Sequence, residues 1–201
     1  GERLNIENPD EYYVKPALVL VDEIPDEMLE ETFAPILYVN LSIADSVLDG
    51  MTKKRSFFTT DNSAMARLYF YLCEEFPSSF EGKNIVEVGS GRGGGARFIS
   101  ENYPLRSFIG LDLSSKSIEF CNDVHENAPH LSFKKGDAEN LPLPNASVDI
   151  VLNVESSHCY PHFEKFIREV SRVLKADGHF IFADFRQPEK MKELEEVFKH
   201  C

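Results

Sequence analysis

The chain has 201 residues, of which 42% are hydrophobic and 27% charged, a composition typical of one globular domain with a sizeable core. Its formal net charge is −13, with the acidic excess concentrated in residues 1–50, which argues against nucleic acid as a partner. No apolar run is long enough to span a membrane and no secretory leader opens the chain, so we expect a cytoplasmic protein. The cysteines are widely spaced and form no Cys-x-x-Cys pair, which favours reduced thiols over structural zinc.

Residues 1–80 are predicted to form a lead-in segment and a helical cap. Residues 17–21 are an apolar run typical of a buried strand, and short helical patterns cover residues 26–33 and 41–48. A longer helix is predicted up to Phe76, because apolar residues recur at helical spacing at Ala64, Leu68, Leu72 and Phe76.

Residues 81–201 alternate predicted strands and helices, and we expect them to form the ligand-binding core. The strands are predicted at residues 84–88, 107–111, 131–134, 148–152 and 178–184. The helices are predicted at residues 94–102, 115–127, 162–174 and 188–200. This order predicts an α/β fold, in which a Rossmann-like parallel sheet is covered on both faces and binds its ligands at the carboxyl ends of the strands.

A glycine-rich turn, GSGRGGG at residues 89–95, follows the first of these strands and opens a helix. Gly89 and Gly91 allow a ligand to approach the backbone closely and allow a positive φ. Gly89, Gly91 and Gly94 also satisfy the pattern GxGxxG, and Asp112 ends the second predicted strand. By itself the turn therefore fits both NAD and S-adenosylmethionine.

Polar residues near the turn favour S-adenosylmethionine. Glu87 precedes the turn, where a carboxylate suits a ligand that carries an ammonium and a sulfonium and repels a pyrophosphate. Asp137 follows the third strand, placed to accept a hydrogen bond from an adenine amino group, and Asn153 and Glu155 end the fourth strand. Acidic groups at successive strand ends match a nucleoside with a cationic tail.

At these residues the chain resembles the class I S-adenosylmethionine-dependent methyltransferases. Within them it is similar to the small-molecule O-methyltransferases related to phthiotriolone/phenolphthiodiolone dimycocerosates methyltransferase. The segments that carry the resemblance are EVGSGRGGGARFI, FIGLDLSSKSIEFC, GDAENLPLPNASVDIVLNVESSHCYP and FIREVSRVLKADGHFIFADFR. The glycine turn is common to the superfamily, whereas NVESSHCYP and FADFR are more particular.

The resemblance implies a set of cofactor contacts. Glu87 would hold the methionine amino group, and the backbone of Gly89 and Gly91 would face the carboxypropyl tail. Asp112 would bind the ribose hydroxyls. The remaining contacts would be made with the adenine and the methionine moiety, by Leu113, Asp137, Ala138 and Asn153.

Similar enzymes place a histidine after the fourth strand and an aspartate at the end of the fifth, and His158 and Asp184 match these positions. His158 would be the general base that deprotonates an acceptor hydroxyl, and Asp184 would orient it. From spacing alone, His158 fits a structural histidine equally well and Asp184 fits a helix cap. His162 lies nearby, but no carboxylate pattern completes a metal site, so we expect no metal.

The acceptor is expected to be a small, lipid-like or polyketide-like molecule, because aromatic and apolar residues are frequent before Gly82. Phe57, Phe58, Tyr69 and Tyr71 either line its pocket or belong to the core. Methylation of oxygen, nitrogen or carbon stays open, as does a homodimer.

Class I enzymes continue past the fifth strand with a helix and an antiparallel strand hairpin. The chain ends at Cys201, so we expect a core without this hairpin, in which residues 178–184 form an exposed edge strand unless that edge is covered in another way. Two other functions stay open at this point: a cofactor-binding but inactive module that acts through protein contacts, and an NAD-dependent oxidoreductase.

Overall fold

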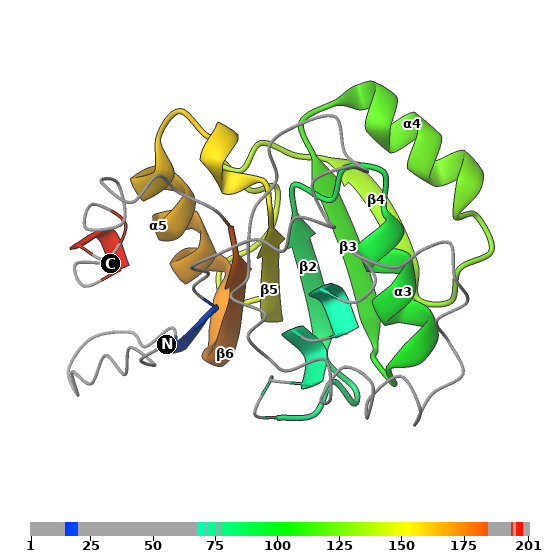
Figure 1. Ribbon diagram of the computed structural model, residues 1–201, viewed down its shortest axis with the longest axis horizontal. Coiled ribbons are helices and arrows are strands. Elements are labelled where there is room, and N and C mark those ends of the chain that lie inside the picture. Colours follow the sequence, from blue (N-terminus) through cyan, green and yellow to red (C-terminus); the bar gives the residue numbers. More distant parts are fainter. Residues whose placement is uncertain are drawn as a thin grey trace, which may run out of the picture.

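The structure is a computed structural model that describes residues 15–19, 68–70, 72–74, 76, 78–184, 194 and 196–198. Its centre is a six-stranded sheet in the order β1-β6-β5-β2-β3-β4, with every neighbouring pair of strands parallel (Figure 1). The strands are β1 (Lys15–Val19), β2 (Asn84–Val88), β3 (Ser107–Asp112), β4 (Leu131–Lys135), β5 (Val148–Val154) and β6 (Leu174–Ala183). The helices with described bounds are α3 (Gly94–Asn102), α4 (Ser115–Val124) and α5 (Phe163–Val173), and a short 3-10 helix follows β5 as η2 (Ser157–Cys159). None of the helices in the described ranges is both long and apolar enough to cross a membrane.

The strands and helices predicted within residues 84–184 are confirmed, with shifted ends. The Ser114 hydroxyl accepts a hydrogen bond from the Ser117 amide at 3.2 Å and thereby caps α4, since it replaces a helical partner for that amide. β6 begins at Leu174 because α5 runs directly into it, and Leu174 pairs with Val148 of β5. The last predicted helix is helical at its described positions 194 and 196–198, whereas residues 26–33 and 41–48 lie outside the described residues.

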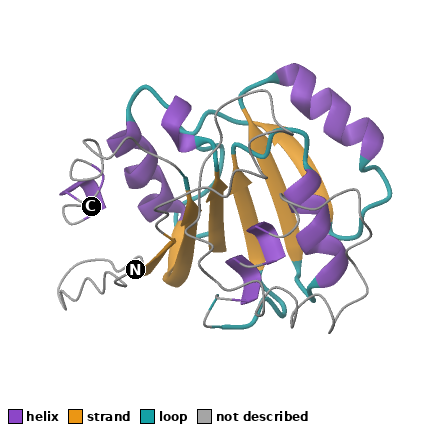
Figure 2. Ribbon diagram, viewed as in Figure 1, coloured by secondary structure: helices purple, strands orange, loops and turns teal. Residues whose placement is uncertain are grey.

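Helices cover both faces of the sheet (Figure 2). On one face, α3 and α4 pack on a core that includes Ile85 of β2 and Phe108 of β3. On the other face, α5 packs on a core that includes Val86 and Val88 of β2. Because successive side chains of a strand alternate between faces, Glu87 shares the face of Ile85 and points toward the layer of α3.

The expectation that residues 178–184 form an exposed edge is wrong. β1 pairs in parallel with β6, from Lys15 opposite His179 to Val19 opposite Ala183. The predicted strand at residues 17–21 is thus present as β1, two residues nearer the N-terminus, and it is the outermost strand of the sheet. Pro16 suits an edge strand because proline has no N–H to donate to a further strand. The edge of β6 is covered by a segment that is distant in the sequence, which local patterns do not indicate.

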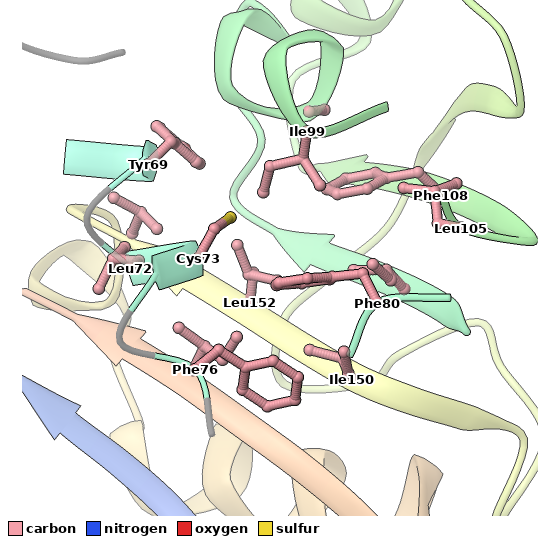
Figure 3. Packing of buried hydrophobic residues seen from close by; sticks show 14 of the residues in the cluster. Tyr69, Leu72, Cys73, Phe76, Phe80, Ile99, Leu105, Phe108, Ile150 and Leu152 are labelled. Carbon is pink, nitrogen blue, oxygen red and sulfur yellow. The ribbon is translucent and has the colours of Figure 1, made fainter. Parts of the chain in front are cut away.

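The described residues between 68 and 80 pack against the same sheet (Figure 3). Residues 68–70 and 72–74 are helical, as predicted, and Leu72, Cys73 and Phe76 are buried. Figure 3 shows Cys73 over Leu152 and Phe76 beside Ile150, both from β5. The division of the chain into residues 1–80 and 81–201 stays a prediction, but part of the predicted cap belongs to the core of the sheet.

The ring of Tyr69 occupies the space that a side chain at Gly95 would need. Gly95 lies in α3, where alanine ordinarily stabilises a helix by about 0.5–1 kcal/mol relative to glycine. A Cβ at Gly95 would overlap with the Tyr69 ring, whereas a Cβ at the neighbouring Gly94 would meet open space. The glycine at residue 95 is therefore required for packing and not for backbone freedom.

We expect Gly95→Ala to lower the free energy of unfolding by about 1–3 kcal/mol, because the buried ring must move or the helix must shift. Gly94→Ala is the matched control and should raise the free energy of unfolding by up to about 1 kcal/mol. Urea unfolding without ligand measures both. Equal stabilisation by the two substitutions would show that the Tyr69 ring does not rest on Gly95.

Candidate functional site

Three carboxylates predicted from the sequence lie at the carboxyl ends of neighbouring strands. Glu87 lies near the end of β2, Asp112 ends β3, and Asp137 follows β4. β2, β3 and β4 are adjacent and parallel, so their carboxyl ends share one edge of the sheet. The structure therefore brings these three residues to one edge, as a common ligand site requires.

The glycine turn between β2 and α3 lies at this edge and uses left-handed backbone. Gly89 and Gly91 have φ of 77° and 54°. A Cβ at Gly89 would also collide with Ser156 and Tyr160, whereas a Cβ at Gly91 would meet open space. Gly89 is thus required by its packing and its backbone, and Gly91 keeps the backbone accessible on the open side of the turn.

Asp112 ties the glycine turn to β3. Its carboxylate accepts hydrogen bonds from the Gly91 amide at 2.9 Å and from the Ser114 amide at 2.8 Å. These two bonds hold the carboxylate between the glycine turn and the start of α4. Leu113, the next residue, is 65% exposed, an unusual exposure for a large apolar side chain. An exposed leucine beside a fixed carboxylate offers an apolar surface to a flat ring.

The turn after β4 is organised by Asp137. Its carboxylate accepts the Glu139 amide at 2.9 Å, and its backbone forms an isolated bridge with Asn140. Asp137 is exposed and Ala138 is half-buried. Both residues lie at the same edge as Asp112, because Asp112 pairs with Lys135 of β4.

Glu87 is fully buried, and its carboxylate is only half used by the described residues. The Tyr69 hydroxyl donates a hydrogen bond to Glu87 Oε1. Glu87 Oε2 accepts no hydrogen bond from the described part of the chain. Burial raises the pKa of Glu87 to about 7, the Tyr69 hydrogen bond opposes this rise, and the nearby negative charge of Asp112 adds to it. A buried oxygen without a donor favours a ligand that supplies a positive donor group.

A polar cluster of Asn153, Ser156 and Tyr160 packs against the glycine turn at Gly89. Asn153 is buried at the end of β5, and its side-chain nitrogen Nδ2 contacts three oxygens. Nδ2 lies 2.8 Å from the Val88 carbonyl, 2.8 Å from Ser156 Oγ and 3.0 Å from the Tyr160 hydroxyl. Asn153 Oδ1 accepts no hydrogen bond from the described residues. Burial raises the pKa of Tyr160 to about 12, so its phenol stays protonated near neutral pH. The cluster holds the turn at the place where Gly89 lacks a side chain.

His158 and Asp184 form a hydrogen-bonded pair after the ends of β5 and β6. His158 Nδ1 lies 2.8 Å from Asp184 Oδ1, and the His158 amide donates to Asp184 Oδ2 at 2.9 Å. Ser157 Oγ donates to the same Oδ2 at 2.5 Å. The Asp184 side chain is fully buried, whereas the His158 side chain is 27% exposed. The imidazole of His158 is therefore partly exposed to solvent, while the buried carboxylate of Asp184 holds it through Nδ1.

Glu155 follows β5 directly, two residues before the start of η2, and has a strained backbone. Its φ is 47°, which is uncommon for a residue other than glycine. Burial, and then the charge of Asp184, raise the pKa of Glu155. The charge of Glu155 in turn contributes to the raised pKa of Tyr69. Strain of this kind is often found at functional sites.

Several residues that position the site by contacts between distant segments are not identified as such by the sequence patterns. Tyr69 was assigned either to a pocket or to the core; it is buried in the core and also bonded to Glu87. Phe57, Phe58 and Tyr71 lie outside the described residues. The roles of Ser156 and Ser157 have no signal in spacing, because both depend on contacts between different strand ends.

Residues 86–182 match the protein family described as a methyltransferase domain. The match runs from β2 to β6 and includes the glycine turn and the ends of β3 and β4. Residues 86–182, called the methyltransferase domain below, are thus similar to the class I S-adenosylmethionine-dependent methyltransferases. This similarity implies S-adenosylmethionine as the cofactor, the second of the two ligands that the glycine turn fits in the sequence.

The methyltransferase domain is similar to curated proteins from mycobacteria. A phthiotriol/phenolphthiotriol dimycocerosates methyltransferase from Mycobacterium leprae is 42% identical over 139 residues, which are 69% of this chain and 51% of that protein. A fatty-acid O-methyltransferase from Mycolicibacterium smegmatis is 48% identical over 106 residues, 53% of this chain and 38% of that protein. The chain thus spans about half or less of the length of these relatives.

A solved structure supports the same fold for the methyltransferase domain. The YcgJ protein from Bacillus subtilis is 29% identical and has a TM-score of 0.57, with 67% of this chain and 56% of that chain covered. The residues described at the strand ends fit S-adenosylmethionine: Glu87 Oε2, which has no donor among the described residues, suits an ammonium, and the exposed Leu113 suits an adenine ring.

The buried Glu87 of the methyltransferase domain predicts a stability cost at high pH. Folded Glu87 keeps its proton up to about pH 7, whereas an unfolded glutamate releases it near pH 4.5. Between these values the folded state binds more protons, so the free energy of unfolding falls as pH rises, by about 3 kcal/mol from this group. Glu87→Gln should remove this part of the pH dependence, as measured by urea unfolding without ligand between pH 4.5 and 8.

The control is Glu101→Gln, which changes an exposed glutamate that pairs with Arg97. It should leave the pH dependence as in the unchanged chain. If Glu87→Gln and Glu101→Gln behave alike, the Glu87 carboxyl does not titrate in a buried environment.

Proposed function

We propose that this chain transfers a methyl group from S-adenosylmethionine to a hydroxyl of a small, lipid-like or polyketide-like acceptor. The observation that supports transfer to oxygen is the His158–Asp184 pair, since an imidazole can accept the proton of a hydroxyl. The pair follows β5 and β6, at the same edge of the sheet as the residues proposed to bind the cofactor. The names of the curated relatives, one of them a fatty-acid O-methyltransferase, support a lipid-like acceptor.

S-adenosylmethionine, when bound, supplies an electrophilic methyl group on a positively charged sulfur. Glu87 would hold the ammonium of the methionine part, and the backbone at Gly89 and Gly91 would lie against its chain. Asp112 would bind the ribose hydroxyls, which suits a carboxylate held in place by the Gly91 and Ser114 amides. The chain's main contribution to rate would be alignment of the acceptor oxygen with the methyl group.

The other candidate contacts surround the adenine and the methionine part. Leu113 would pack on the adenine ring, and its exposure supports this role. Asp137 and Ala138 would bind the edge of the ring. Asn153 would lie beside the methionine part of the cofactor, where its side chain is buried and donates a hydrogen bond to the Val88 carbonyl.

His158 would take the proton from the acceptor hydroxyl as the methyl group is transferred. Because Asp184 bonds to Nδ1, the neutral imidazole carries its proton on Nδ1 and presents Nε2 as the base. The buried Asp184 fixes the ring by two further hydrogen bonds to the same segment, from Ser157 and from the His158 amide. Asp184 is therefore a positioning residue, and His158 is the candidate catalytic base.

The direct test is transfer of a labelled methyl group from S-adenosylmethionine to a panel of fatty acids, lipid diols and lipid phenols, with cofactor binding measured on the same preparation. We expect a labelled methyl ether or ester from at least one acceptor class. Cofactor binding without label on the oxygen of any of these acceptors would contradict the proposed transfer to a lipid-like hydroxyl.

His158→Ala should lower kcat by about 10²–10⁴-fold, with unchanged affinity for S-adenosylhomocysteine, because a positioned general base contributes this range. The matched control is His162→Ala, which removes an exposed imidazole that makes no capping hydrogen bond at the start of α5. It should retain turnover. Retained turnover in His158→Ala, with normal cofactor binding, would exclude His158 as the base.

A further inference from the structure

Tyr69 and Glu87 form a hydrogen-bonded polar pair on the face of the sheet that carries the apolar core around Ile85. Tyr69 is 6% exposed and Glu87 is fully buried, and the phenol donates to Glu87 Oε1. Tyr69 comes from the helical residues 68–70, whereas Glu87 comes from β2, so the contact joins the segment before the sheet to a strand end. The two residues meet because both face the layer that contains α3.

The two oxygens of Glu87 have different surroundings. Oε1 is occupied by the Tyr69 hydroxyl, and Oε2 accepts no hydrogen bond from the described residues. A carboxylate can accept several donors, so one phenol leaves capacity for another. The Tyr69 ring is itself held in place, because it fills the space beside Gly95 that a side chain would take.

We propose that Tyr69 is a positioning residue for the cofactor, which holds Glu87 through Oε1 so that Oε2 receives the ammonium of the bound amino acid tail. This inference rests on the proposed binding of S-adenosylmethionine and extends it to a residue outside the matched domain, residues 86–182. The cofactor site then includes the segment that precedes the sheet. Binding of the ammonium is coupled to ionisation of Glu87, and Tyr69 favours the ionised form by donating to it.

The charges around the pair determine the direction of the pH effect. Besides Tyr69, the carboxylate of Asp112 acts on the pKa of Glu87, and Glu155 and Cys73 act on the pKa of Tyr69. Burial and the Asp112 carboxylate raise the pKa of Glu87 to about 7, and the Tyr69 hydrogen bond acts against them. Loss of the phenol therefore moves ionisation of Glu87 to higher pH, and an ammonium ligand then binds more weakly near neutral pH.

The test compares Tyr69→Phe with the unchanged chain by calorimetric titration between pH 6 and 8, with two probes. S-adenosylhomocysteine carries the amino acid tail, and 5′-methylthioadenosine lacks it. We expect Tyr69→Phe to weaken S-adenosylhomocysteine binding about tenfold at neutral pH, as loss of a hydrogen bond to a charged group predicts. Binding of 5′-methylthioadenosine should be unchanged, which also shows that the variant is folded.

The pH profile separates positioning from a purely structural role. In the unchanged chain, affinity for S-adenosylhomocysteine should fall as pH decreases below about 7, since free Glu87 is then protonated. In Tyr69→Phe, the midpoint of this fall should lie at higher pH. The matched control is Tyr103→Phe, which removes a more exposed phenol that donates to Glu74 at 3.3 Å, and it should change neither affinity nor profile.

Three results would overturn the inference. Equal affinities for S-adenosylhomocysteine in Tyr69→Phe and the unchanged chain would show that Tyr69 does not act on Glu87. Tighter binding in Tyr69→Phe would show that the phenol occupies the place of the ligand. Equal losses for both probes would indicate a general disturbance of the site. Absence of S-adenosylhomocysteine binding by the unchanged chain would instead contradict the proposed function itself.

Discussion

The parallel pairing of all strands is the constraint on which the site depends. Residues at the ends of β6, β5, β2, β3 and β4 come from distant parts of the sequence, yet parallel pairing brings these ends to one edge. With helices on both faces, that edge is the place where polar side chains can leave the core. The glycine turn, the acidic residues and the His158–Asp184 pair all lie there.

A buried carboxyl group is the main cost of this arrangement. Glu87 lies on the same face of β2 as Ile85 and therefore points into an apolar layer, where its charge is disfavoured. Tyr69 offsets part of this cost with one hydrogen bond, and Gly95 makes room for the Tyr69 ring. Glu87 Oε2 accepts no hydrogen bond from the described residues, so a cationic ligand could supply the donor that this buried oxygen lacks.

The candidate site was predictable where its residues follow local rules. The glycine turn with Gly89 and Gly91 joins a strand to a helix, and Asp112 ends a strand. Each of these local patterns can be recognised within a short stretch of sequence. His158 and Asp184 were named from resemblance, and their hydrogen bond depends on the pairing of β5 with β6. The sequence left Tyr69 open between an acceptor pocket and the core and gave no sign of its bond to Glu87 or of the role of Ser156. A single tyrosine on an apolar helix and a serine in a loop have no pattern of their own.

The sequence by itself determined the strands and helices between residues 84 and 184, the turn that joins β2 to α3 and the cap of α4, since each depends on neighbours within a few residues. Only the tertiary structure decided that β1 covers the edge of β6, and that Tyr69 reaches Glu87. Both contacts join segments that are far apart in the sequence. Their energies come from burial and hydrogen bonding between distant residues, which local spacing does not encode.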